Sequence, residues 1–338
     1  TRETGLHHAH SSIIGWMPMT EETLERLTEI PNLQVLKGAS LASYTRFGIG
    51  GRADLLAETQ NIEALGAAIE AARESGMPLL VIGGGTNLIV SDDGFRGLVV
   101  RCTAKELRFE DGRIVADAGV DLDGLVDFAV GRNLQGIETL KRIPGSVGGA
   151  VYGNAGAYGH SISERISRVR FVDGSELRCF TKPECSFSYR ESIFKRHKEW
   201  VIVSAEFALR SGDPAELKQT VSTIQATRDQ KFPPTMKCAG SIFKNLLAAE
   251  LSPELVQRIP SRVIREGKVP AAYFLEEVGA KGMMRGDIHV TSYHANVIYN
   301  AGAGTARDLV DLIRELKTRV KDCFGLILEE EVQYVGFD

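Results

Sequence analysis

The sequence predicts an α+β fold with more than one compact unit, and three observations lead to this prediction. The chain has 338 residues, which at roughly 150 residues per domain corresponds to about two or three domains. Up to about residue 210, segments with helical periodicity alternate with short apolar segments typical of strands. The pattern changes after Ser211-Gly212, which predicts a boundary there between a larger, sheet-rich unit and a smaller unit.

The composition is that of an ordinary globular protein, with 43% hydrophobic and 25% charged residues. The 40 basic and 44 acidic residues give a net charge of −4, which argues against a general binder of nucleic acids or anionic membranes. No apolar run reaches the roughly 20 residues that span a bilayer. We therefore expect a soluble protein that binds no nucleic acid and does not insert into a membrane.

The cysteines are scattered, and no pair has the Cys-X-X-Cys spacing of a zinc site. An odd, scattered set fits reduced thiols better than a disulfide framework, so we expect a cytoplasmic protein without a metal site. The five residues are Cys102, Cys179, Cys185, Cys238 and Cys323.

The first 18 residues form a polar leader that contains His7, His8 and His10. Three histidines can hold a metal ion, but a flexible or added terminal segment is the favoured interpretation. After the leader, Thr20 is a candidate N-cap for a short helix over residues 20–29.

Alternating elements follow the first helix. Asn61 can cap a helix that begins at residue 62 and ends near Gly76. The apolar runs at 77–82 and 98–100 predict two buried strands.

Asp121 opens the next predicted helix, which carries its apolar residues on one face. Strand-like runs at 169–172 and 176–180 flank the Asp173-Gly174 pair, which predicts a β-hairpin. Residues 200–209 predict a long strand.

The smaller unit begins with Asp213-Pro214, an N-cap followed by proline at the first helical position. Two further helices are predicted to begin at Ser252-Pro253 and at Thr305. A final strand is predicted over residues 326–335.

The first glycine-rich loop is Gly83-Gly84-Gly85-Thr86-Asn87, between two apolar runs. Three glycines let the backbone approach a ligand closely and present several N–H groups to an anion such as a diphosphate. For this loop alone, a tight turn between strands is the favoured interpretation. The order strand–glycine–strand also disfavours a nicotinamide-dinucleotide motif, in which the glycines lead from a strand into a helix.

A second glycine-rich region covers residues 143–150 and 154–159. Two such loops of small and polar residues favour an extended ligand that lies against the backbone, such as a dinucleotide. The alternative is a long, buried, irregular loop packed by small residues.

Four further blocks accompany the glycine loops. They are Tyr44-Thr45-Arg46-Phe47-Gly48-Ile49-Gly50-Gly51, Ser188-Tyr189-Arg190-Glu191-Ser192-Ile193-Phe194, Ala239-Gly240-Ser241-Ile242-Phe243-Lys244-Asn245 and Leu328-Glu329-Glu330-Glu331-Val332. Taken in order over roughly residues 40–338, all these blocks resemble the MurB family, the UDP-N-acetylenolpyruvoylglucosamine reductases of peptidoglycan synthesis. The glycine loops alone also resemble the wider flavin-binding superfamily of the vanillyl-alcohol oxidase type.

The resemblance implies a two-subdomain FAD-binding fold of the vanillyl-alcohol oxidase type and a smaller α+β substrate-binding domain. One branch of the family has an inserted segment whose tyrosine covers the substrate. Here Ser211-Gly212-Asp213 leads directly into a helix, so the chain resembles the shorter branch that lacks this lid. The implied parts are an N-terminal extension (1–40), a first subdomain (41–98) that the C-terminal strand (325–338) joins, a second subdomain (99–210) and the substrate-binding domain (211–324).

The resemblance also implies a cytoplasmic flavoenzyme with non-covalently bound FAD and with NADPH as electron donor. Its implied reaction is the reduction of UDP-N-acetylglucosamine enolpyruvate to UDP-N-acetylmuramate, with no obligatory protein partner. The implied FAD contacts are Arg46, Gly83, Gly84, Gly85, Thr86, Asn87, Ile143, Gly145, Ser146, Gly149, Asn154, Ala155 and Gly156.

Three residues match the family's catalytic positions. Arg190 matches an arginine that stabilises charge at the substrate carboxylate, Ser241 a serine that donates the proton, and Glu331 an acid on the final strand. The flavin must supply the hydride, because no side chain can. Without the resemblance, the three residues read as a surface arginine, a loop serine bonded to its own backbone, and part of a charged edge strand.

Tyr158, Tyr189, Lys231 and Asn245 are implied to contact the substrate, with Lys231 as a cation for the diphosphate. A solvated lysine is an equally good interpretation of Lys231 from the sequence alone. Two other functions stay open: another FAD-dependent oxidoreductase of the superfamily that acts on an alcohol or sugar, and a non-catalytic nucleotide-sugar-binding protein.

Overall fold

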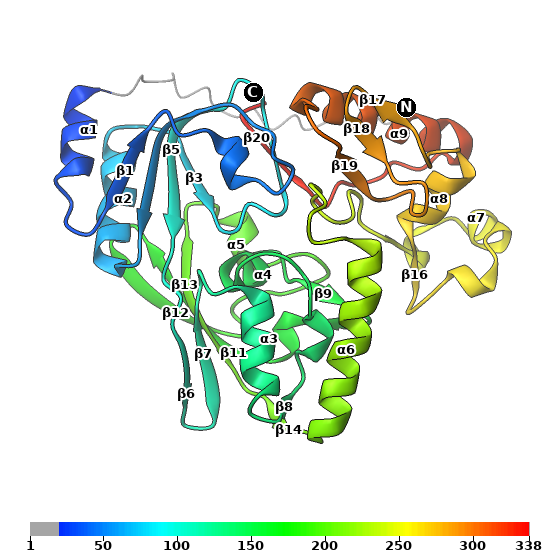
Figure 1. Ribbon diagram of the computed structural model, residues 1–338, viewed down its shortest axis with the longest axis horizontal. Coiled ribbons are helices and arrows are strands. Elements are labelled where there is room, and N and C mark those ends of the chain that lie inside the picture. Colours follow the sequence, from blue (N-terminus) through cyan, green and yellow to red (C-terminus); the bar gives the residue numbers. More distant parts are fainter. Residues whose placement is uncertain (1–19, 338) are drawn as a thin grey trace, which may run out of the picture.

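The computed structural model describes residues 20–337, so the predicted leader and its three histidines lie outside the described residues. The described chain is a mixture of helices and strands, as predicted, arranged in three packed parts (Figure 1). No helix among the described residues has the length and apolar character needed to cross a membrane. All five cysteines are free thiols.

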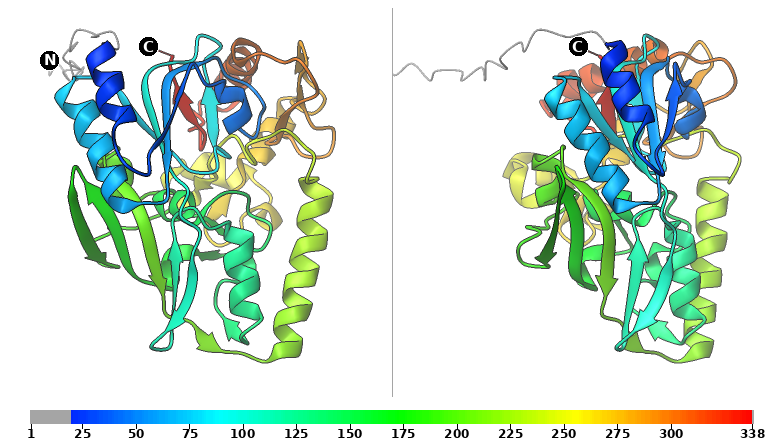
Figure 2. Two further views of the ribbon diagram at one scale, coloured as in Figure 1. Left: turned by 60° about the vertical axis from the view of Figure 1, so that its left-hand side comes forward. Right: turned by 90° about the vertical axis from the view of Figure 1, so that its left-hand side faces the viewer.

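The first part is a four-stranded sheet in the order β1 (Gln34–Lys37), β2 (Ala53–Thr59), β5 (Phe95–Cys102) and β3 (Leu79–Ile82). β2, β5 and β3 are parallel, and β1 pairs antiparallel with β2. The helices α1 (Glu21–Thr28) and α2 (Ile62–Glu74) lie side by side against this sheet (Figure 2).

The described residues of the predicted N-terminal extension belong to this first part. β1 is the edge strand of the sheet, with Gln34 opposite Glu58. Leu27 of α1 is fully buried in the same apolar core as Leu65 and Leu98. A boundary at residue 40 therefore does not separate an independent segment, because burial and strand pairing tie residues 20–37 to the sheet.

The second part is a five-stranded antiparallel sheet in the order β12 (Glu176–Thr181), β11 (Ile166–Asp173), β13 (Val201–Phe207), β7 (Arg113–Asp117) and β6 (Leu107–Glu110). The helices α3 (Leu122–Val130) and α4 (Val147–Tyr152) share its apolar core. The predicted hairpin is confirmed, but its turn is shifted by one residue. Asp173 pairs with Glu176, so Gly174 and Ser175 form the turn and Gly174 takes the positive φ of 63°.

The third part contains a three-stranded sheet of β17 (Met284–Arg285), β18 (Ile288–Val290) and β19 (Ile298–Asn300). It packs with α8 (Ala271–Glu277) and α9 (Ala306–Phe324) around a second large apolar core. The remaining short elements are β8 (Leu134–Gln135), β9 (Gly156–Ala157), β10 (His160–Ser161), α5 (Ile193–Arg196), β14 (Arg210–Ser211), β15 (Leu246–Leu247), α7 (Pro253–Arg258) and β16 (Lys268–Val269).

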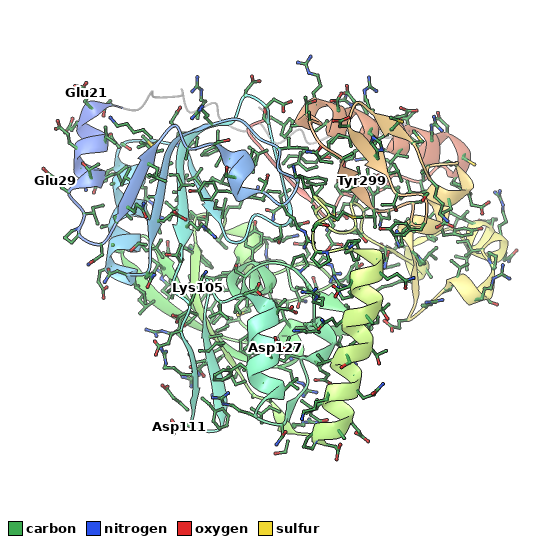
Figure 3. All side chains as sticks on the ribbon, in the orientation of Figure 1. Glu21, Glu29, Lys105, Asp111, Asp127 and Tyr299 are labelled. Carbon is green, nitrogen blue, oxygen red and sulfur yellow. The ribbon has the colours of Figure 1, made fainter. Side chains whose placement is uncertain are left out.

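A long helix, α6 (Pro214–Lys231), connects the second and third parts and runs beside α3 (Figure 1). Two basic residues between the helices hold them together. Lys141 Nζ lies 2.8 Å from Asp127 Oδ1 of α3, a residue labelled in Figure 3. Arg142 donates from Nε and Nη2 to the two carboxylate oxygens of Asp229 on α6, at 2.8 and 2.9 Å. The C-terminal end of α6 is thereby fixed against the second part.

The C-terminal strand packs against the first part, since Val335 lies in the same apolar core as Leu56 and Ile82. This strand, β20 (Gln333–Val335), pairs in parallel with β4 (Leu88–Val90). It is shorter than the predicted run of 326–335, because the residues before it pair elsewhere: Glu330 bridges Phe243 in the third part.

Six predicted helix starts are confirmed, since each helix begins directly after its predicted N-cap. At all of them except Asp121, the cap side chain accepts a hydrogen bond from a backbone N–H of the first turn. The cap residues are Thr20, Asn61, Asp121, Asp213, Ser252 and Thr305.

Asp92, in the loop after β4, supplies a second cap to α9 from another part of the molecule. Its two carboxylate oxygens accept from Ala306 N at 2.9 Å and Arg307 N at 3.0 Å. Asp92→Ala is expected to lower the free energy of unfolding by about 1 kcal/mol, because two first-turn N–H groups and the positive helix end lose this carboxylate. Urea denaturation followed by circular dichroism measures this difference.

The matched control is Asp93→Ala, because the backbone N–H of Asp93 is bonded to Ser91 Oγ while its carboxylate does not cap a helix. This variant is expected to stay within about 0.5 kcal/mol of the unmodified protein. Equal destabilisation by the two substitutions would contradict the capping role of Asp92.

Candidate active site

A cavity of about 500 Å³ lies where the three parts meet. Its wall combines β3 and the first glycine loop, the second glycine region, the end of α6, residues 239–245 and the C-terminal strand. Every predicted site residue except Arg46, Asn154 and Tyr158 lines this cavity. Segments from positions as distant as 83 and 331 in the chain therefore form one site.

The two glycine loops face each other in this wall. Thr86 Oγ1 donates to Pro144 O at 3.2 Å, which joins the loops directly. A Cβ atom added to Gly83 would lie 2.6 Å from Ser146 Oγ, and one added to Gly84 would lie 3.1 Å from Gly145 Cα. The loops approach so closely that these positions have no room for side chains, and the wall here is mainly backbone. Backbone N–H groups can bind a diphosphate, so this wall suits an extended ligand that contains one.

Arg190 lies at the tip of a tight turn. Ser188 and Glu191 exchange two backbone hydrogen bonds of 3.1 Å, and Arg190 between them has a left-handed φ of 58°. A non-glycine residue in this conformation costs about 1–2 kcal/mol, and such strain is concentrated at functional sites. The turn directs Tyr189 and Arg190 to the cavity.

The Arg190 guanidinium has two protein partners. Its Nε donates to Glu331 Oε1 at 2.6 Å, and its Nη2 donates to Gly156 O at 2.9 Å. About a fifth of its side chain remains exposed in the cavity wall. Arg190 is therefore oriented by Glu331 and still has N–H groups that can bind an anion.

The backbone around Glu331 is also fixed. Its N–H donates to Ile242 O at 2.7 Å, and its carbonyl accepts from Asn87 Nδ2 at 2.9 Å. The side chain of Asn87, a residue of the first glycine loop, thereby contacts the segment that precedes β20.

Ser241 lies on a segment packed between residues 296–297 and residues 329–331. Gly240 before it has a φ of 79°, a conformation that favours glycine. The amide of Asn296, which is 3% exposed, accepts from Phe243 N and donates to Phe243 O, both at 2.9 Å. The serine hydroxyl is thereby carried on rigid backbone in the same cavity as Arg190 and Glu331.

Arg228 and Lys231 bring two positive charges to the last turn of α6, one helical turn apart. Arg228 Nε is buried without a hydrogen-bond partner in the described structure, and burial lowers the pKa of this guanidinium. Burial and the nearby Arg228 also lower the pKa of Lys231 to about 8. Two desolvated cations that line one cavity are a site for an anion.

Arg228 was not predicted from the sequence. The available signal is its position three residues before Lys231 on a helix, which puts both residues on one face. Other residues of the lining were also not predicted, because they belong to ordinary strands, a short helix and the loop after it. They include Leu79, Leu80, Cys102, Lys195, Lys198, Trp200 and Ile202.

Three predicted residues lie outside the lining. Asn154 is buried and its amide is used within the protein, since Nδ2 donates to Ser188 O at 2.6 Å. Arg46 donates from its backbone N–H to Gly85 O at 3.1 Å and from Nε to Met236 O at 3.5 Å. Tyr158 is 50% exposed on the turn between β9 and β10. Asn154 and Arg46 therefore support the turn of Arg190 and the first glycine loop from behind the cavity wall.

Tyr189 and Asn245 lie together in the wall, where Asn245 N donates to Tyr189 Oη at 3.3 Å. Lys268 Nζ lies 4.3 Å from the centre of the Tyr189 ring. Among residues 20–337, no group of three or more His, Cys, Asp or Glu side chains is arranged to hold a metal ion.

Two family models match separate parts of the chain. The model of an FAD binding domain matches residues 53–178. The model of the C-terminal domain of UDP-N-acetylenolpyruvoylglucosamine reductase matches residues 232–335. Together they support the predicted fold class, an FAD-binding fold followed by a smaller α+β unit.

Individual proteins match over almost the whole chain. A UDP-N-acetylenolpyruvoylglucosamine reductase of Solibacter usitatus is 61% identical over 311 residues, which cover 92% of this chain and 100% of the relative. One of Syntrophus aciditrophicus is 37% identical, covering 93% and 96%. The crystal structure of the UDP-N-acetylenolpyruvylglucosamine reductase of Thermus caldophilus superposes with a TM-score of 0.70 at 26% identity, covering 90% and 98%. The chain therefore belongs to the UDP-N-acetylenolpyruvoylglucosamine reductase (MurB) family.

Proposed function

We propose that this protein is an FAD-dependent reductase that uses NADPH to convert UDP-N-acetylglucosamine enolpyruvate to UDP-N-acetylmuramate in peptidoglycan synthesis. One observation carries the proposal: Arg190, Ser241 and Glu331 line the same cavity although they lie on three separate segments, and Glu331 orients Arg190. Free cysteines throughout the chain support a cytoplasmic location.

The glycine loops fit FAD, because a wall of backbone without side chains admits an extended dinucleotide. The residues that would hold FAD are those of the predicted set that line the cavity: Gly83, Gly84, Gly85, Thr86, Asn87, Ile143, Gly145, Ser146, Gly149, Ala155 and Gly156. When bound, FAD supplies the hydride, which originates from NADPH.

Arg190 binds the carboxylate of the enolpyruvyl group through its remaining N–H groups. Hydride addition at the terminal carbon shifts negative charge to the carbon next to that carboxylate and onto the carboxylate itself. A fixed guanidinium stabilises this charge more than the neutral double bond of the ground state. Glu331 holds Arg190 in this orientation through the 2.6 Å ion pair.

Ser241 donates the proton to the carbon that carries the carboxylate, and this completes the lactyl ether of the product. A serine hydroxyl is a weak acid, so it can protonate only a strongly basic carbon such as the one formed by hydride addition. The rigid backbone around Ser241 keeps the hydroxyl at one position in the cavity wall.

Arg228 and Lys231 bind the diphosphate of the nucleotide sugar, and Tyr189 and Asn245 form the adjoining wall. The connection between β13 and α6 consists only of residues 208–213, so no lid segment is inserted there. This agrees with the shorter branch of the family.

Substrate affinity is expected to decrease above pH 8, because Lys231 loses its proton there. The pKa is lowered, so the ammonium is present below about pH 8 and the diphosphate pairs with it only in that range. Above this pH, the protonated fraction of Lys231 falls about tenfold per pH unit. The Kd for the substrate is therefore expected to rise by up to about tenfold per pH unit. Titrations of the substrate at several pH values measure this effect.

The matched variant for this pH effect is Lys231→Met, which keeps a long side chain but carries no charge. Its affinity is expected to be weak at all pH values and to lack the decrease above pH 8. A variant with the same pH dependence as the unmodified protein would contradict the assignment to Lys231.

The proposed function is tested by an absorption spectrum recorded anaerobically as NADPH and then the enolpyruvyl substrate are added. A flavin spectrum that bleaches with NADPH and returns with the substrate is the expected result. Bleaching without return would contradict the substrate and favour another oxidoreductase of the superfamily, acting on an alcohol or sugar. A protein that cannot bind FAD would contradict the whole proposal.

A further inference from the structure

The three segments that carry Arg190, Ser241 and Glu331 converge on one lysine outside the cavity lining. Lys244 lies three residues after Ser241. Its Nζ lies 3.1 Å from Glu191 Oε1, next to Arg190, and also pairs with Glu329, two residues before Glu331. One ammonium therefore contacts all three segments: it belongs to one and forms ion pairs with the other two.

The backbone strengthens this arrangement. Lys244 N donates to Glu329 O at 2.9 Å, and the adjacent residues Phe243 and Glu330 form an antiparallel β-bridge. On the Arg190 side, Lys195 Nζ donates to Arg190 O at 2.8 Å and lies 3.3 Å from the same Glu191 oxygen. The side chain of Lys244 is only 12% exposed, so these contacts are partly shielded from water.

Each of the three consecutive glutamates has a different cation. Glu329 pairs with Lys244, Glu330 with Lys317 of α9 at 2.8 Å, and Glu331 with Arg190 at 2.6 Å. In an extended chain, successive side chains point to opposite faces, and these three glutamates follow that rule: the middle one points away from the other two. This distribution assigns Glu331 alone to Arg190.

Removal of the Lys244 charge would leave Glu329 without this cation and Glu191 with Lys195 as its remaining cation. The link between the segment of Arg190 and the segment of Glu331 would then be lost, because Lys244 is the ammonium that pairs with both Glu191 and Glu329. Burial of Lys244 disfavours its charge, but its hydrogen bonds to Glu329 and Glu191 outweigh this and raise its pKa. The ammonium therefore stays charged at neutral pH.

We infer that Lys244 is a positioning residue that holds Arg190, Ser241 and Glu331 in the relative positions they need. In these positions Ser241 protonates the substrate, and Arg190, oriented by Glu331, stabilises the negative charge that forms on it. The inference rests on the proposed function, because it concerns the step in which the enolpyruvyl group is reduced. Lys244 does not line the cavity, so it acts through the geometry of the other three residues.

The test uses three variants of the full-length flavoprotein. Lys244→Met removes the charge and keeps the length of the side chain, and Lys244→Arg restores a cation that can pair with two carboxylates. Lys317→Met is the matched control, because it removes the cation of the neighbouring Glu330 on the α9 side. Stopped-flow absorbance measures flavin reduction by NADPH and reoxidation by the enolpyruvyl substrate as separate rates.

In Lys244→Met, reoxidation is expected to slow by about 10- to 100-fold, because misplacement by about 1 Å has effects of this size. Reduction by NADPH is expected to change less than about threefold, because that half-reaction does not use Arg190, Ser241 or Glu331. Lys244→Arg is expected to recover most of the rate, and Lys317→Met to keep it.

Two outcomes would overturn the inference: normal reoxidation of Lys244→Met, or equal loss of rate in Lys244→Met and Lys317→Met, which would indicate a general effect on the fold. Failure of the proposed function has a different signature. The unmodified protein itself would then not be reoxidised by the enolpyruvyl substrate, and the inference would fall with the function.

Discussion

Ser241→Ala is expected to slow reoxidation by the enolpyruvyl substrate by roughly 10²–10⁴-fold, the usual contribution of a positioned general acid. Reduction by NADPH is expected to proceed at the normal rate, because that half-reaction needs no proton from this hydroxyl. The substitution removes one oxygen from a segment held by backbone bonds to residues 296 and 331, so the fold is expected to be unchanged. Stopped-flow absorbance measures both rates with one sample.

Ser241→Cys is the matched variant, because a thiol is of similar size and retains a proton that can be donated. It is expected to be faster than Ser241→Ala in reoxidation. The Ser163→Ala variant serves as a further control, since Ser163 is buried and does not line the cavity. Normal reoxidation of Ser241→Ala would contradict the role of Ser241 as proton donor.

Local features of the fold could be predicted from the sequence. A helix N-cap depends on one side chain and the next three residues, so Thr20, Asn61 and Thr305 could be identified from their neighbours alone. Long-range pairing could not be predicted in this way. Nothing in residues 34–37 indicates pairing with β2, and the boundary at residue 40 therefore did not match the sheet.

The candidate site shows the same division. The glycine loops are visible in the sequence because glycine is required where two backbones approach closely, as at Gly84 and Gly85. The role of Asn154 behind the wall depends on its contact with Ser188, which is 34 residues away in the chain. Arg228 was missed because desolvation by the surrounding parts, and not its own sequence context, makes it an unpartnered cation.

Arg190→Lys is expected to lower the rate of reoxidation by about 10²–10³-fold, the range found when one fixed donor to a developing anion is removed. Arginine at this position contacts Glu331 and Gly156 O with two different nitrogens and keeps further N–H groups for the substrate carboxylate. Lysine carries the same charge on a single nitrogen, which cannot form these separate contacts at once. Both residues have a Cβ, so the strain of the positive φ at position 190 is unchanged.

The control for Arg190→Lys is Arg178→Lys, a substitution of the same kind on the exposed strand β12. This variant is expected to react at the normal rate in both half-reactions. Reoxidation of Arg190→Lys at the normal rate would contradict the assignment of Arg190 to the substrate carboxylate, since a single ammonium would then be sufficient.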